Sequence, residues 1–352
     1  MKGGNPVAGT LGDGGQNKPG GCLPIGAIDR CQAVVRRRTL QSLLAVLLVL
    51  GVILSGATVR AAALDDSRFF FSGDGRIDLL SEKNGHSFSG PYRNGAQRYD
   101  ESALQTICRV FDAPYDPELS NLSLRLLEFL DFLQDSLHRE AKITITSGYR
   151  SPEYNTRVRN RGGLAAKASL HQYGMAVDIK LEGVPAKRVW NAVKTLGFGG
   201  AGYYHGATVH IDVGPARSWD ETTSGVGTGI SDDNKLIGLV SEYDRYRPGE
   251  TVALRFIRMT AFPIGVAAEF TLDGRAGSGG AKKTVKFTPS LTIAADPACP
   301  VFDDIDQMAH IRWRLPDDLP PGRYTVRARF CGVEWKGMPP EIATPEFEVV
   351  RP

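Results

Sequence analysis

The sequence predicts a mixed α+β domain followed by an all-β domain, behind an N-terminal export segment. Up to residue 196, stretches with apolar residues at helical spacing alternate with short runs at strand spacing. Beyond about residue 243 only short alternating runs occur, separated by Pro and Gly. The chain has 352 residues, of which 23% are charged and 42% hydrophobic. This is ordinary globular composition with room for two hydrophobic cores, and it excludes a disordered chain or a membrane protein with many spans.

The first 63 residues are expected to form a leader. Residues 1–38 are rich in Gly and Pro and lack periodic apolar positions, which is typical of disorder, here on the cytoplasmic side. Residues 39–63 indicate a signal peptide or a membrane anchor, because the uncharged stretch 40–59 is long enough for one bilayer crossing. Arg36-Arg37-Arg38 favours an N-terminus on the inside, and Ala61-Ala62-Ala63 offers a cleavage site. Cleavage and retention as an inner-membrane tether both stay open, and either places the following residues in the periplasm or cell envelope.

Residues 66–222 are predicted to form the α+β domain. Two of its expected helices have an apolar face, the third is bounded by Pro185 and Gly197, and its expected strands are marked by β-branched alternation or by Gly-bounded turns. Helices are predicted over 100–111, 118–138 and 185–196, and β structure over 68–98 and 142–146.

Residues 243–352 are predicted to form an immunoglobulin-like β-sandwich, joined to the first domain by a linker at 223–242. Its alternating runs are short and punctuated by Pro and Gly, as in sandwich domains. These runs are 252–256, 270–272, 285–287, 311–315, 324–328 and 347–349. Nothing in them identifies a partner for this domain.

The cysteines beyond the leader divide into one core residue and one candidate pair. Cys108 falls on the apolar stripe of an expected helix, so it is expected to be buried as a thiol. Cys299 and Cys331 lie in the second domain, where an oxidising compartment permits a disulfide.

Three residues of the first domain have the pattern of a hydrolytic metal site. Apolar and polar residues alternate around Asp178, so this side chain is expected to project from one face of a strand. His210 and Asp212 lie two apart in another strand-like run and share a face. His171 precedes the first of these runs, and Gly174 permits a turn between them. If the two strands are neighbours, two imidazoles and a carboxylate converge.

Two histidines and one carboxylate are a ligand set of catalytic zinc, because they leave one coordination position open. Zinc held in this way activates water and polarises a scissile carbonyl. Taken alone, each residue has an ordinary structural explanation: a cap for His171, an ion pair for Asp178, and a half-buried strand position for His210. Their spacing taken together favours zinc.

The residues around these three occur as motifs in a fixed order. The motifs are Ser147-Gly148-Tyr149-Arg150-Ser151, Ser169-x-His171-x6-Asp178, Gly202-Tyr203-Tyr204 and Val209-His210-Ile211-Asp212-x-Gly214-Pro215-Ala216-Arg217-x-Trp219. Together they resemble the LAS-type zinc peptidases, the superfamily of D-alanyl-D-alanine carboxypeptidases, VanX, VanY and the hedgehog zinc fold. Within it, the chain is most similar to the exported murein endopeptidases of the MepK-like branch. The resemblance covers about 66–220 and is densest over 143–219.

This resemblance implies a hedgehog/D-Ala-D-Ala-peptidase-like zinc domain that acts on peptidoglycan stem peptides. It implies that Zn²⁺ is bound by the two histidines and the aspartate singled out above. Arg150 matches the family arginine that faces the substrate, where a guanidinium can hold a carboxylate or an oxyanion. A structural ion pair beneath the site is the other interpretation of Arg150. Further expected substrate contacts are Ser147, Tyr149, Tyr203 and Tyr204.

The general base is the one part of the family pattern that this sequence does not supply directly. Many relatives in the superfamily carry an acidic residue three positions before the last histidine ligand, and Ala207 occupies that position here. Asp212 is the nearest alternative, either as base or as a residue that orients a histidine ligand. His205 is the other candidate.

The expected function is therefore hydrolysis of stem-peptide cross-links by a zinc metallopeptidase. Two alternatives stay open: a carboxypeptidase that removes terminal D-alanine, and a wall-binding protein that keeps the zinc scaffold without catalysis. A net charge of +3 is too small to indicate a nucleic-acid partner and is compatible with an anionic wall polymer.

Overall fold

The computed structural model describes residues 67–95, 98–116, 122–162, 165–223, 233–276, 282–290, 298–332 and 335–351. The predicted leader, including the apolar stretch 40–59, lies outside these residues. Within the described ranges, no helix is both long and apolar enough to cross a membrane. The chain after residue 62 forms one compact unit of mixed α+β structure with more strands than helices.

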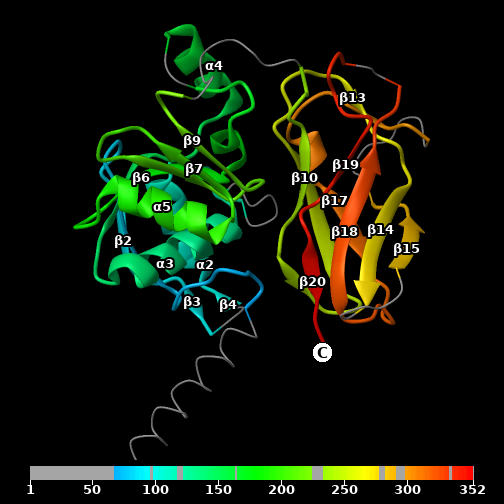
Figure 1. Cartoon of the computed structure of the whole chain (residues 1–352), viewed down its shortest axis with the longest axis horizontal. Helices are drawn as coiled ribbons and strands as arrows, with labels where there is room; N and C mark the ends of the chain where they lie inside the picture. Colours follow the sequence, from blue (N-terminus) through cyan, green and yellow to red (C-terminus); the bar gives the residue numbers. More distant parts are fainter. Residues whose placement is uncertain are drawn as a thin grey trace, which may run out of the picture. The chain divides into compact units, whose positions relative to one another are not determined.

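A seven-stranded sheet organises the first half of this unit (Figure 1). Most neighbouring strands are antiparallel, and only the pairs β1–β5 and β7–β9 are parallel. In spatial order the strands are β2 (Ser87–Pro91), β1 (Arg76–Ser81), β5 (Ile143–Ser147), β6 (Ala176–Leu181), β8 (Val209–Asp212), β7 (Gly200–Tyr203) and β9 (Arg217–Asp220). A separate hairpin is formed by β3 (Arg93–Asn94) and β4 (Arg98–Tyr99).

The β structure predicted over 68–98 includes a hairpin. β1 and β2 pair across the turn at Asn84-Gly85, where Gly85 has a φ of 73° that favours glycine. The predicted strand over 142–146 corresponds to β5.

The helices pack mainly where the apolar periodicity places them. They are α2 (Glu101–Val110), α3 (Leu124–His138), α4 (Pro152–Asn160) and α5 (Ala186–Leu196). The prediction over 118–138 placed the start of its helix too early, because α3 begins after Ser123, and residues 117–121 lie outside the described part. α4 was not predicted, since only Asn155 in it is buried and it therefore has no apolar stripe. Its start is fixed locally: Ser151 accepts a hydrogen bond from the Tyr154 N–H (3.2 Å), and Pro152 occupies the first turn.

The core of this half lies between the sheet and its helices: α5 packs on β6, β7 and β8, α2 on β1 and β2, and α3 on β1. Val177 and Ile179 on β6, and Val209 and Ile211 on β8, are at most 1% exposed. Because side chains alternate between the two faces of a strand, the residues between these four project from the opposite face. This places Asp178 and His210 away from the apolar layer.

The second half of the unit is built from strands. A three-stranded sheet contains β10 (Gly238–Ser241), β12 (Thr251–Ile257) and β17 (Ile311–Arg314). A six-stranded sheet contains β11 (Arg245–Tyr246), β20 (Phe347–Val349), β18 (Gly322–Arg329), β14 (Phe270–Ala276), β15 (Lys282–Phe287) and, paired with β18, β19 (Glu341–Ala343). The smaller elements are β13 (Ile264–Gly265), β16 (Val301–Phe302) and the 3₁₀ turn η2 (Gln307–Ala309).

Aromatic side chains connect these two sheets. Phe287 of β15 stacks on Trp313 of β17 with ring centroids 3.6 Å apart, and Phe256 of β12 contacts Phe330 at 5.9 Å. A strand is present at each of the six predicted runs. The segment expected to be a linker also contains a strand, β10, which pairs with β12.

Buried polar contacts join the two halves of the compact unit. Arg125 on α3 pairs with Asp244 at 2.8 Å, and both side chains are only 7% exposed. The backbone N–H of Phe70 donates to the same carboxylate (3.0 Å). Removal of either charged partner would leave the other buried and unpaired, which is costly in a low-dielectric interior.

The described cysteines have the expected arrangement. Cys299 and Cys331 form a disulfide, and Cys108 on α2 is a buried free thiol, 6% exposed. Burial raises the pKa of the Cys108 thiol to about 11, so this residue is protonated and unreactive at neutral pH.

We expect a protein that begins at residue 64 to contain one titratable thiol after unfolding without reductant, and three after reduction. The bridge closes a loop with a sequence separation of 32 residues. In the chain-entropy model such a loop stabilises the fold by about 3 kcal/mol, so Cys299→Ser with Cys331→Ser should lower the free energy of unfolding by that order. Three thiols before reduction would contradict the pairing.

Candidate metal centre

His171 is held by a 3₁₀ turn, η1 (Leu170–Tyr173), that ends at Gly174 with a left-handed φ of 60°. Its Nδ1 lies 2.7 Å from the carbonyl oxygen of Gly148 and, as a donor, fixes the ring. Gly148 cannot carry a Cβ, because that atom would collide with the backbone of Phe111. The contact leaves His171 Nε2 as the nitrogen that faces the other two residues.

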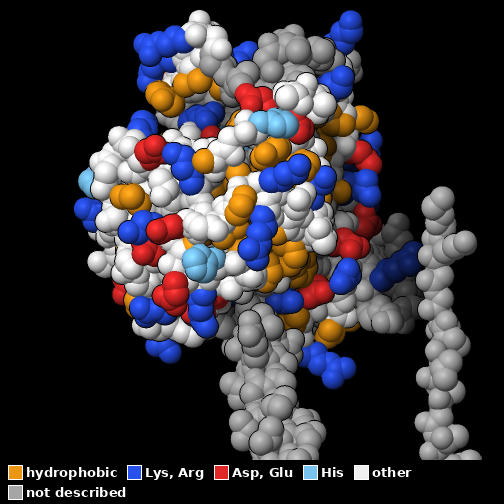
Figure 2. Space-filling model, turned by 60° about the vertical axis from the view of Figure 1, so that its left-hand side comes forward, with side chains coloured by type: hydrophobic (Ala, Val, Ile, Leu, Met, Phe, Trp, Pro, Cys, Tyr) orange, Lys and Arg blue, Asp and Glu red, His pale blue; other side chains and the backbone are white. Residues whose placement is uncertain are grey.

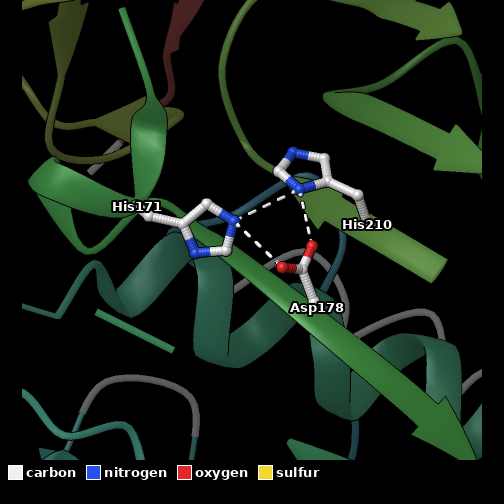
Figure 3. A group of neighbouring side chains, drawn as sticks. All are labelled: His171, Asp178 and His210. Atoms are coloured by element: carbon white, nitrogen blue, oxygen red, sulfur yellow. Dashed lines mark hydrogen bonds and ion pairs between the residues drawn. The ribbon is translucent and has the colours of Figure 1, made fainter. Parts of the chain in front are cut away.

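The pairing of β6 with β8 brings Asp178 and His210 together. These two residues are directly opposite each other in the antiparallel register, and so their side chains share a face. His210 Nδ1 lies 3.0 Å from Asp178 Oδ1 and 3.3 Å from His171 Nε2. Figure 3 shows the three side chains converging from η1, β6 and β8. Their candidate ligand atoms lie within 4.8 Å of one another, and all three side chains are buried.

The second ring nitrogen of His210 is held by Asp212. The Asp212 Oδ2 atom lies 2.9 Å from His210 Nε2, on the side of the ring away from Asp178. Asp212 is fully buried and also accepts hydrogen bonds from the Gly214 N–H (2.9 Å) and from both terminal nitrogens of Arg217 (2.9 and 2.6 Å). This arrangement is that of a residue which orients a histidine ligand. It disfavours Asp212 as a base, because its oxygens are occupied behind the ring.

The electrostatics of the cluster favour cation binding. Burial lowers the pKa of His171, which keeps this imidazole neutral with a free lone pair. Burial by itself raises the pKa of Asp178, but His171 and His210 outweigh it and hold that pKa well below its usual range. Burial opposes protonation of His210, yet its hydrogen bonds to Asp178 and Asp212 raise its pKa to about 9. A cation bound between the three residues would take the place of the proton that Asp178 and Asp212 draw to His210.

Two of the candidate ligands, His171 and His210, border a cleft. It is lined by Arg150, Ala166, Ala168, Ser169, Leu170, His171, Tyr204, His210, Arg217, Trp219, Glu221, Leu236 and Arg258. On the face of the molecule drawn in Figure 2, Lys and Arg side chains are interspersed with Asp and Glu, without an extended basic surface.

Two more of the residues singled out from the sequence contact Asp178. Arg150 Nη2 donates to Asp178 Oδ2 (3.0 Å), and Arg150 Nε donates to the hydroxyl of Ser147 (3.0 Å). The Tyr204 hydroxyl donates to Asp178 Oδ1 (3.1 Å). Arg150 and Tyr204 line the cleft, so the ion pair and a position facing a substrate are compatible for Arg150.

Besides Asp212, four predicted catalytic or substrate-binding residues do not line this cleft: Ser147, Tyr149, Tyr203 and His205. His205 is close to Asp220, with its Nε2 2.6 Å from that carboxylate, and is largely exposed. Tyr203 stacks on Trp190 with centroids 5.5 Å apart. Tyr149 lines a separate small pocket beside Phe111. The spacing of the motif could not distinguish these side chains from their neighbours, because adjacent residues at a strand end point in different directions.

The sequence reasoning missed several cleft residues. Trp219 of β9 packs 5.7 Å from the His210 ring and 5.2 Å from that of Tyr204. Gly202 on β7 leaves room for the indole, since a Cβ there would collide with it. Trp219 was visible in the motif, as was Arg217. Glu221, Leu236 and Arg258 carried no signal, because they lie outside the motif and reach the cleft only through folding.

A second group of acidic residues, Asp74, Asp131 and Asp135, is also close enough to share a cation. Arg139 pairs with two of these residues, at 2.5 Å from Asp74 and 3.3 Å from Asp135, while Asp131 accepts hydrogen bonds from the Gly75 N–H (2.8 Å) and the Tyr92 hydroxyl (2.7 Å). The group is an ion-pair network and gives no indication of a metal.

Comparison with known proteins identifies relatives of the first half of the chain. Residues 74–219 match the family model described as peptidoglycan L,D-endopeptidase MepK. The MepK protein of Escherichia coli (strain K12) is 31% identical over 170 residues, which cover 47% of this chain and 93% of that protein. A probable MepK of Haemophilus influenzae is 39% identical over 82 residues, 23% of this chain and 44% of that protein.

The matched segment contains His171, Asp178 and His210 together with the strands that carry them. It accounts for nearly the whole length of the Escherichia coli relative. This chain therefore belongs to the MepK family of peptidases.

Proposed function

We propose that this protein is a zinc-dependent peptidoglycan endopeptidase that hydrolyses cross-links between stem peptides outside the cytoplasm. The observation that carries the proposal is the buried cluster of His171, Asp178 and His210 at the base of an open cleft, in a chain of the MepK family. The function of the relatives, peptidoglycan L,D-endopeptidase, supplies the substrate class.

The residues of the cluster fit a zinc ion. Two imidazole nitrogens and a carboxylate are zinc donors, and the ring nitrogen of each histidine that faces away is held by Gly148 or Asp212. Zinc in this position would supply a Lewis acid for the scissile carbonyl and would make water acidic enough to attack near neutral pH. His171, Asp178 and His210 are the proposed ligands.

The other side chains of the cleft have distinct proposed roles. Arg150 faces the cleft from above Asp178, so its guanidinium is the proposed donor to the oxyanion that develops on the substrate carbonyl. Tyr204 and Ser147 hold Asp178 and Arg150 in place, as the two hydrogen bonds described above support. Trp219 offers an apolar wall for the peptide.

Glu221 is the proposed general base. Among the described residues that line the cleft it is the one carboxylate, and it follows β9 directly, next to Trp219. Asp212 is assigned the orientation of His210. His205, paired with Asp220 outside the lining, is a less suitable base.

The proposal includes the domain organisation and the export of the chain. The peptidase domain spans 66–222, and the strands after it form an immunoglobulin-like sandwich, supported by two sheets joined through aromatic contacts. Residues 1–63 direct the protein to the periplasm and, if uncleaved, tether it to the inner membrane. The substrate of the family, a wall polymer, requires such a location.

The test of function is digestion of defined muropeptides by the zinc-loaded protein. Cross-linked dimers should be converted to monomers, identified by mass, while pentapeptide monomers should lose no terminal D-alanine. Loss of terminal D-alanine alone would show the carboxypeptidase alternative to be correct. Absence of any product would favour a non-catalytic zinc scaffold.

Replacement of any proposed ligand by Ala should remove about one zinc per chain, because three protein ligands are the minimum for such a site. Metal content can be measured by atomic emission after dialysis, with circular dichroism as a control for folding. Replacement of the exposed Asp317, which pairs with Arg314 far from the cluster in sequence, should leave the zinc bound. Retention of zinc in all three ligand variants would disprove the assignment.

Asp212→Asn and Glu221→Gln, two matched carboxylate-to-amide changes, should separate orientation from base catalysis. Asp212→Asn should weaken zinc affinity by about 10- to 100-fold, with activity restored by excess zinc. Glu221→Gln should keep the zinc and reduce kcat by roughly 10²- to 10⁴-fold, without rescue by zinc. The reverse pattern would assign the base to Asp212, and an unchanged kcat in Glu221→Gln would exclude Glu221.

A further inference from the structure

We propose that Arg258, a residue of the β-rich second half, forms a carboxylate-binding subsite in the peptidase cleft. The inference rests on the proposed function and names a feature of the substrate that the cleft recognises. Arg258 lies beyond residues 74–219, the segment that matches the family, so the family likeness does not assign it a role.

The Arg258 guanidinium is buried without a counterion. The residue is 9% exposed, it lines the cleft beside the candidate ligands, and its Nε atom has no hydrogen-bond partner. Within the part of the chain that the structure describes, no carboxylate forms an ion pair with it. A buried guanidinium keeps its charge in proteins, so its desolvation is not relieved by loss of a proton. Asp212 attracts this charge but forms its ion pair with Arg217, so Arg258 is left able to pair with an anion of the substrate.

The other two arginines of the cleft differ in this respect. Arg150 is paired with Asp178 at 3.0 Å, and Arg217 is paired with Asp212 at 2.6 Å. The partner of Arg150 belongs to the metal cluster, and the partner of Arg217 is the residue that orients His210. Among the arginines of the described lining, Arg258 is the one without an ion pair, so it is available to bind a carboxylate of the substrate.

The backbone of Arg258 is also unusual. The residue follows β12 and has a φ of +59°, a left-handed conformation that a non-glycine residue adopts at a cost. A long charged side chain in a strained backbone and a buried position does not favour stability. Such combinations occur where function requires a particular side-chain position.

Contacts with the peptidase half fix the segment that carries Arg258. The backbone N–H of Met259 donates to the Tyr173 hydroxyl (2.9 Å), and Arg255 donates to the Tyr173 carbonyl (3.2 Å). Tyr173 belongs to η1, the same turn that carries His171. The position of Arg258 is therefore coupled to the turn that presents a candidate zinc ligand.

The chemistry of the substrate matches this cation. A peptide cross-linked through the side chain of a diamino acid retains the carboxylate of that residue, and each stem ends in another carboxylate. A guanidinium binds a carboxylate through two parallel hydrogen bonds, which fix its orientation as well as its charge. Arg258 would thus position the cross-linked peptide across the cleft, with its scissile bond over the metal cluster.

The experiment compares two substrates in the zinc-loaded full chain. One is a cross-linked muropeptide dimer with free carboxylates, and the other is its analogue with those groups converted to carboxamides. Arg258→Gln should raise KM for the free acid by roughly 10- to 100-fold, the worth of a hydrogen-bonded charge, and leave kcat nearly unchanged. KM for the amide should be the same in wild type and variant. Arg258→Lys, which keeps the charge without the fork, should have an intermediate KM for the acid.

The controls separate recognition from folding. Arg258→Gln should have a Tm no lower than that of the wild type, because it removes a buried unpaired charge. Arg314→Gln, a change of an exposed arginine in the same half, should alter neither KM value. An equal loss on both substrates, no loss on either, or a lower Tm with reduced zinc content would overturn the proposal.

Failure of the proposed function would be visible separately, as absence of hydrolysis of either substrate by the wild-type protein. In that case calorimetric binding of the free-acid and amidated dimers decides the role of Arg258. A selective loss of affinity for the acid in Arg258→Gln supports the subsite. Equal affinities of wild type and variant for the acid overturn it.

Discussion

The antiparallel pairing of β6 with β8 is the constraint on which the metal cluster depends. It sets Asp178 directly opposite His210, at a separation that backbone hydrogen bonds determine. A shift of either strand by one residue in this register would turn that strand's ligand into the apolar layer beneath α5. The buried residues on either side of Asp178 and His210 resist that shift, because they would be moved towards the cleft. The core therefore specifies the register, and the register specifies the site.

The ion pairs around the metal cluster depend on the same strand pairing. Asp212 lies on the same face of β8 as His210 and holds the ring nitrogen that points away from Asp178. Arg217 neutralises Asp212, and Arg150 neutralises Asp178, so the buried carboxylates are ionised and fixed. Each ion pair fixes the side-chain position of its carboxylate. Arg258 lies outside this scheme, and its unpaired charge distinguishes it from the other arginines of the cleft.

The β-rich second half of the chain makes specific polar contacts with the peptidase half. Tyr173 belongs to η1, the turn that carries His171. Its hydroxyl accepts a hydrogen bond from the Met259 N–H, and its carbonyl accepts one from Arg255 of β12. The buried pair of Arg125 with Asp244 joins the two halves at another point. Motion between the halves would break these contacts, so they couple the geometry of the cleft to the β-rich part.

The sequence by itself determined the features that depend on short-range patterns along the chain. Period-two alternation placed Asp178 and His210 on strand faces, an apolar stripe located α2, Pro185 and Gly197 bounded α5, and two cysteines in an exported domain indicated a disulfide. Each of these signals depends on neighbours in the chain, which sequence displays directly. The short helix α4 escaped prediction because it buries almost nothing and has no stripe.

Only the tertiary structure decided which atoms meet. From spacing alone, Asp212 could reach either side of the His210 ring, and the buried contact with Arg217 turned it to the far side. Glu221 and Arg258 line the cleft although both lie beyond the motif. Glu221 directly follows β9, and Arg258 directly follows β12. Their positions follow from strand pairing and from contacts between the two halves, which join residues distant in sequence. Such contacts leave no periodic trace in the chain, and for that physical reason the sequence could not reveal them.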